Sequence, residues 1–210
     1  MSPDGSDPLR DLVGESYAAG CTLSGGLDAG TELSGLDLED CHIAGGVLER
    51  TTWRQCRLDG CTVSGVDLSL SRFVDVRVSD STIRDSKARA VSWTGLRSSG
   101  LAETSISFER CRLDYGSFVG VDCRGMRFDS CSLVDADFVD ADCREVEFVG
   151  CDLSGARFAR ADLRGARVVG SVGLALDARE TRTRGLRVDL SAALALVTAL
   201  GIEVVDSPGE

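Results

Sequence analysis

Residues 131–170 read CSLVDADFVDADCREVEFVGCDLSGARFARADLRGARVVG, and every fifth position from Leu133 onward holds Leu, Phe, Cys or Val. Positions in this class hold all seven Phe and both Trp of the chain. Small residues lie two positions earlier, and Gly often lies two positions later. Neither a helix nor a flat strand has a period of five. The pattern predicts short extended edges that turn two side chains inward, each followed by a corner where Gly adopts positive φ.

Identical residues also return every twenty positions, which indicates how many edges close one coil. Twenty residues correspond to four five-residue edges, so the sequence predicts a square all-β solenoid with like side chains stacked in ladders. The residues that recur in this way are Cys21, Cys41 and Cys61; Phe108, Phe128 and Phe148; and Phe118, Phe138 and Phe158.

Three of the units resemble the A(D/N)LxX motif of the pentapeptide-repeat family. They are ADFVD at 136–140, CDLSG at 151–155 and ADLRG at 161–165. The resemblance covers residues from about 21 to 170. It implies the fold of that family, a right-handed quadrilateral β-helix.

The two ends of the chain differ from the repeat. Residues 1–11 hold Pro, Gly and polar residues and are expected to form a flexible segment before a β-helix over 12–170. Residues 171–210 are expected to form a C-terminal cap and dimerisation segment. Within it we predict a helix over 190–200, capped by Asp189 and ended by Gly201, and a short strand over 202–205.

The predicted helix is apolar on most sides, so we expect it to be covered on most sides. One side can cap the open edge of the last coil, and a second copy of the chain can cover the other. A monomeric cap is the alternative. The candidate dimer-interface residues are Leu190, Leu194, Leu196, Val197 and Leu200.

The remaining composition argues against catalysis and metal binding and against several classes of binding partner. All nine Cys fall in the inward classes, so we expect them to be structural, with no metal, cofactor or disulfide. His42 is the only histidine and lies on an outward position, so we expect no catalytic residues and no enzyme. The formal charge of -11 argues against nucleic acid as a ligand. No secretory or membrane-spanning segment is evident, and we expect a cytoplasmic protein without a membrane partner.

Between residues 84 and 105 the repeat is irregular. The phase of five is the same on both sides, so any insertion is a multiple of five residues. A distorted coil, a bend and a projecting loop are all compatible with the pattern, and the sequence does not say whether a loop here is functional.

The C-terminal sequence, with Gly185, Asp189, the Ala/Leu-rich helix and GIEV at 201–204, resembles the ends of MfpA/Qnr-type pentapeptide-repeat proteins. That resemblance implies a homodimeric DNA mimic that binds a type II topoisomerase, DNA gyrase or topoisomerase IV, and protects it from quinolones or other poisons. A scaffold with a different partner is the alternative.

The charge pattern adds a candidate surface for such a partner. Asp122, Asp142 and Asp162 form one predicted outward column in the C-terminal half, and Arg57, Arg77 and Arg97 form what reads as a different column in the N-terminal half. We therefore expect acid to be concentrated toward the C-terminal end. An Asp at this repeat position can also serve the local backbone instead. The candidate partner-binding residues are Asp122, Asp142, Asp162, Asp135, Asp137, Asp140 and Glu145.

Overall fold

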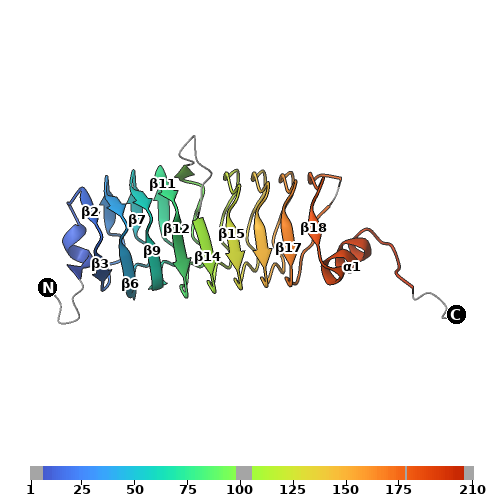
Figure 1. Ribbon diagram of the computed structural model, residues 1–210, viewed down its shortest axis with the longest axis horizontal. Coiled ribbons are helices and arrows are strands. Elements are labelled where there is room, and N and C mark those ends of the chain that lie inside the picture. Colours follow the sequence, from blue (N-terminus) through green and yellow to red (C-terminus); the bar gives the residue numbers. More distant parts are fainter. Residues whose placement is uncertain (1–6, 98–105, 178, 206–210) are drawn as a thin grey trace.

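The computed structural model describes residues 7–97, 106–177 and 179–205. The chain forms a rod of stacked parallel coils, with β1 at one end and α1 at the other (Figure 1). The predicted all-β quadrilateral solenoid with a C-terminal helix is confirmed.

Three faces of the rod are parallel sheets. The ten-stranded face runs β1-β3-β6-β9-β12-β14-β15-β16-β17-β18, the five-stranded face β13-β11-β8-β5-β2, and the three-stranded face β10-β7-β4. On the fourth face, single parallel β-bridges join each coil to the next. They connect, one after another, Asp67, Lys87, Arg112, Ser132, Asp152 and Val172. The elements are β1 Asp7–Pro8, η1 Leu9–Leu12, β2 Tyr17–Ala19, β3 Thr22–Ser24, β4 Glu32–Ser34, β5 Asp37–Glu39, β6 His42–Val47, β7 Thr52–Arg54, β8 Arg57–Asp59, β9 Thr62–Asp67, β10 Arg72–Val74, β11 Val76–Ser79, β12 Ser81–Arg84, β13 Leu96–Arg97, β14 Ile106–Glu109, β15 Arg127–Asp129, β16 Glu147–Val149, β17 Arg167–Val169, β18 Arg187–Val188 and α1 Leu190–Ala199.

Stacked aromatic rings fill the C-terminal half of the interior. Phe138 is fully buried, and its ring stacks between those of Phe118 and Phe158 with centroid distances of 4.6 and 5.1 Å. A second ladder from Phe108 through Phe148 meets the first edge to face. Each ring occupies the same inward position one coil further on, as the intervals of twenty predict.

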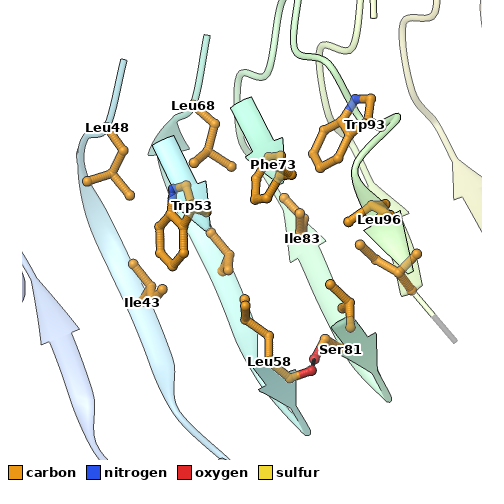
Figure 2. A pocket seen from close by; sticks show the side chains of 13 residues that line it. Ile43, Leu48, Trp53, Leu58, Leu68, Phe73, Ser81, Ile83, Trp93 and Leu96 are labelled. Carbon is orange, nitrogen blue, oxygen red and sulfur yellow. Dashed lines mark hydrogen bonds between the residues drawn. The ribbon is translucent and has the colours of Figure 1, made fainter. Parts of the chain in front are cut away.

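The N-terminal half of the interior is filled differently. One aromatic ladder, Trp53, Phe73 and Trp93, runs beside Ile, Leu and Val side chains (Figure 2). A cavity of about 20 Å³ remains among them. Such a volume is about one water probe, so this half is also packed nearly without voids.

The irregular patch contains an insertion of one five-residue unit. Leu96 pairs with Val76, twenty residues earlier, whereas Phe108 pairs with Ile83 at an interval of twenty-five. The interval returns to twenty between Phe108 and Phe128. Five extra residues preserve the inward phase, which is why the sequence could not distinguish an insertion from a distorted coil. Most of the inserted stretch lies outside the described residues.

Both ends depart from the predicted boundaries. Residues 7–11 belong to the coil stack, because β1 pairs with β3 and Leu9 is fully buried. The coils also continue past 170, since β18 pairs with β17. The helix begins after Asp189, as expected, with the carboxylate accepting a hydrogen bond from Ala192 N at 2.9 Å. Residues 202–205 form no strand.

The corners have the positive φ that the Gly pattern predicts, and many of them are occupied by other residues. Ala90 has φ +51° and Glu145 has φ +60°. The left-handed conformation is unfavourable for residues with a Cβ, and Asp and Asn tolerate it better than most. Each non-glycine corner is therefore a position where Gly is the more stable choice unless the side chain compensates.

We expect Ala90→Gly to stabilise the protein by roughly 0.5–1 kcal/mol, because Gly relieves the left-handed strain at φ +51°. Ala29 is also exposed but lacks positive φ, so Ala29→Gly should destabilise by roughly 0.5–1 kcal/mol. Denaturant unfolding of both variants measures the difference. Equal destabilisation by the two substitutions would contradict this account of the corners.

Candidate partner-binding surface

The three aspartates of the predicted acidic column each form the same local structure. Asp162 accepts a hydrogen bond from the backbone N–H of Arg164 at 3.2 Å, and the Arg164 guanidinium binds both of its oxygens. The same arrangement joins Asp122 to Arg124 and Asp142 to Arg144. The aspartates therefore support the backbone and are neutralised by an arginine two residues later.

Two more candidates are ion-paired with arginines of the next coil. Asp137 pairs with Arg157, and Asp140 binds Arg160 through both oxygens at 2.7 and 2.8 Å. Asp137 also accepts a hydrogen bond from Val139 N, so it too serves its own backbone.

Asp135 and Glu145 differ from the other five candidates. Both are exposed corner residues with positive φ, and neither takes part in the ion pairs of the described residues. The corners one coil before and one coil after Glu145 are Gly125 and Gly165, which also have positive φ. Glutamate has no intrinsic preference for this left-handed conformation. These two carboxylates carry uncompensated charge at the outer edge of the rod.

The arginine contacts lower the pKa of the paired carboxyl groups. Hydrogen bonds from Arg124 and Arg164 lower the pKa of Asp122 and Asp162 below the usual Asp value, and Arg160 does the same for Asp140. All three carboxylates are therefore ionised at neutral pH while their charge is locally balanced.

The acidic and basic columns lie on the same face. Because of the inserted unit, Arg57, Arg77 and Arg97 on the five-stranded face are followed by Asp122 and Asp142 in the same row. The acidic residues are also not concentrated in the C-terminal half. Residues 98–210 hold nineteen Asp or Glu and thirteen Arg or Lys, whereas residues 1–97 hold fifteen and ten, so the two parts have similar formal charges of -6 and -5. The expectation of an acidic half counted the aspartates without the arginines that follow them.

The C-terminal end of the rod is apolar and largely exposed. Leu190 and Leu194 of α1 are 76% and 40% exposed, and Leu200 just after it is 51% exposed. Leu196 and Val197 are half-buried. Beneath the helix lies an open hollow of about 220 Å³, lined mainly by Leu176, Leu186, Val188, Leu196 and Leu200. The predicted interface residues therefore form one exposed end.

The structure brings no catalytic or metal-binding cluster together within the described residues. His42 Nε2 lies 2.7 Å from Ser64 Oγ on the ten-stranded face. No group of three or more His, Cys, Asp or Glu in the described ranges could hold a metal ion. The nine cysteines, all within the described residues, form no disulfide, and eight are buried. Among the described residues, no helix is long and apolar enough to cross a membrane.

Comparison with known families identifies the repeat. Residues 100–168 match the family model of the pentapeptide repeat region. Residues 100–168 of this chain are therefore a pentapeptide-repeat region. The inward ladders and coil register extend the same architecture on both sides of the matched residues.

The chain is similar to solved structures over most of its length. A trypsin-treated variant of QnrB1, a plasmid-mediated fluoroquinolone resistance protein, matches with a TM-score of 0.62 and 18% identity over 90% of this chain and 100% of that one. HetL from the cyanobacterium Nostoc, involved in the regulation of heterocyst differentiation, matches with a TM-score of 0.40 and 18% identity over 81% and 86%. No curated protein sequence matches. At 18% identity, the similarity to the QnrB1 variant shows the fold alone.

The ion pairs of the aspartate column predict loss of stability in acid. A carboxyl whose native pKa is lowered stabilises the fold fully above the ordinary Asp pKa of about 3.9, and this contribution is lost as pH falls through the lower native value. We therefore expect thermal stability to be level from pH 7 to 5 and to fall below about pH 4.

Asp162→Asn tests the origin of that acid sensitivity. The Asp162 side chain is only 12% exposed, so removing its charge should cost about 1–2 kcal/mol at pH 7. Protonation of Asp162 removes the same charge from the native protein, so the difference should shrink toward pH 2. Thermal unfolding across this range measures it. A difference that is independent of pH would rule out the ion pair as its source.

Proposed function

We propose that this protein is a non-enzymatic, homodimeric rod that binds a type II topoisomerase, DNA gyrase or topoisomerase IV, at its DNA-binding surface and protects it from quinolones or other poisons. The observation that carries the proposal is the rigid coil stack, with an unclosed apolar end and uncompensated corner carboxylates. The full-length fold similarity to a fluoroquinolone resistance protein supports it. Its action is occupancy of a surface, with no bond made or broken.

Dimerisation through the C-terminal end follows from the different closure of the two ends. The N-terminal end is closed by η1, which buries Leu9 and Leu12. The C-terminal end leaves Leu190, Leu194 and Leu200 in contact with water above an open hollow. A second copy would cover this apolar surface and remove the last open sheet edges. The resulting rod would have twice the monomer's length.

The charge distribution favours the corners as the primary contact with a basic partner. Asp135 and Glu145 can pair with partner cations without first giving up an arginine of their own. The aspartates at 122, 142 and 162 would have to exchange Arg124, Arg144 and Arg164 for partner groups, with little net gain.

The functional prediction uses a gyrase supercoiling assay and quinolone-induced DNA cleavage. The wild-type protein should change at least one of them at micromolar concentration. Asp135→Asn with Glu145→Gln should weaken the effect about tenfold, since each exposed charge pair contributes about 0.2–1 kcal/mol and the dimer presents each residue twice. The control Asp28→Asn with Glu49→Gln removes equal charge from the N-terminal half and should leave the effect intact.

A wild-type protein without effect in either assay would exclude the topoisomerase and favour a scaffold with a different partner. Equal weakening by the variant and its control would instead mean that only net charge matters.

Light scattering tests the dimer independently. Leu194→Asp places a charge in the exposed apolar end and should convert the dimer to a monomer. Val47→Asp places the same charge on the side of the rod, where Val47 is 55% exposed, and should leave the dimer unchanged. A wild type that is monomeric at micromolar concentration would reject this assembly.

A further inference from the structure

Two cysteines near the N-terminal end lie with their sulfur atoms in direct contact. Cys21 Sγ is 3.0 Å from Cys41 Sγ. The residues occupy matching positions in adjacent coils, just before β3 and β6, which pair in the register Thr22 with His42. Parallel strands lie about 4.8 Å apart, which falls inside the Cα–Cα range that a disulfide spans. The backbone therefore already has the separation that a disulfide requires.

Other stacked cysteines also interact through their side chains, Cys131 with Cys111 and Cys151, and Cys123 with Cys143. Cys61 is in register with Cys41, yet Cys61 Sγ points to the carbonyl oxygen of Leu38 at 3.3 Å. Cys131 and Cys151 likewise point to carbonyl oxygens of the preceding coil, those of Phe108 and Phe128. Cys41 Sγ also points to a carbonyl oxygen of the preceding coil, that of Ala18 at 3.4 Å, so the first pair differs from the others in the position of Cys21.

Accessibility also distinguishes this pair. Cys21 is the only cysteine that is not buried, and Cys41 behind it is 1% exposed. Cys123 and Cys143 also occupy matching positions, but both are fully buried. A small oxidant can reach Cys21 from solvent while the other thiols are shielded by the coils.

We propose that Cys21 and Cys41 form a redox-sensitive dithiol that hydrogen peroxide converts to a disulfide joining two adjacent N-terminal coils. The Cys21 thiolate attacks one peroxide oxygen, the O–O bond breaks, and Cys21 sulfenic acid and hydroxide form. The Cys41 thiolate then attacks the Cys21 sulfur and displaces a second hydroxide as the S–S bond forms. The two thiol protons convert both hydroxides to water, so one peroxide is reduced for each disulfide.

The disulfide would stabilise the N-terminal end of the coil stack. Terminal coils of a solenoid have a neighbour on one side only and open first. A cross-link between residues 21 and 41 closes a twenty-residue loop and restricts the unfolded chain. Oxidation therefore strengthens the N-terminal end without altering the proposed partner surface, and the inference does not depend on the proposed function.

The experiment is peroxide treatment of the folded, fully reduced protein, followed by denaturation, alkylation and mass spectrometry. Seven of the nine thiols should be alkylated after oxidation, and all nine in the untreated protein. Cleavage after Glu15, Glu32, Glu39 and Glu49 places the cysteines in peptides 16–32 and 40–49, which should migrate as one species until a reductant is added. The oxidised protein should also unfold at a higher temperature than the reduced protein.

Three substitutions separate this pair from the other cysteines. Cys21→Ser should retain all eight thiols after peroxide, and Cys41→Ser should lose only the Cys21 thiol, as a sulfenic acid without a disulfide, whereas Cys61→Ser should lose two of its eight. Serine already fills the same inward position at Ser71 and Ser81, so these variants should fold, and circular dichroism checks that they do. Nine alkylated thiols, a link between Cys123 and Cys143, or over-oxidised Cys21 without a link would each overturn the proposal.

Discussion

Each inward side chain stacks on the side chain that occupies the same edge of the neighbouring coil, and the rest of the structure depends on this register. The stacking places Phe138 between Phe118 and Phe158 and sets thiols in rows. It also explains how the rod tolerates extra residues. A five-residue insertion keeps Ile83 opposite Phe108 and the inward phase intact, whereas an insertion of another length would turn the core side chains outward.

The same register determines the charge of the surface. Outward positions two residues apart lie side by side on one edge, so Asp162 meets Arg164 within its own edge and Arg182 in the next coil. Repeated along the face, this pairing places rows of aspartates beside rows of arginines, and their charges balance. Under the proposed function, recognition of a basic partner would use carboxylates outside the pattern, such as Asp135 and Glu145 at the corners. An acidic protein with balanced faces differs in this respect from a uniform phosphate backbone.

The sequence was sufficient to predict the fold, the core and the structural position of the cysteines, because each depends only on the period. It was not sufficient to place the insertion, since five residues leave the period unchanged. The ion pairs could have been foreseen, because Arg follows Asp by two positions at 122, 142 and 162. The packing of Leu9 at the N-terminal end carried no periodic signal, and the sulfur contact of Cys21 depends on side-chain orientation that the repeat does not encode.

The proposed occupancy of a topoisomerase's DNA-binding surface is tested most directly by competition with DNA. Binding of the protein to purified gyrase is measured at rising concentrations of linear duplex DNA. The account predicts that the apparent Kd of the protein rises in proportion to the DNA concentration once the DNA site is saturated. An affinity that is unchanged at saturating DNA would contradict it.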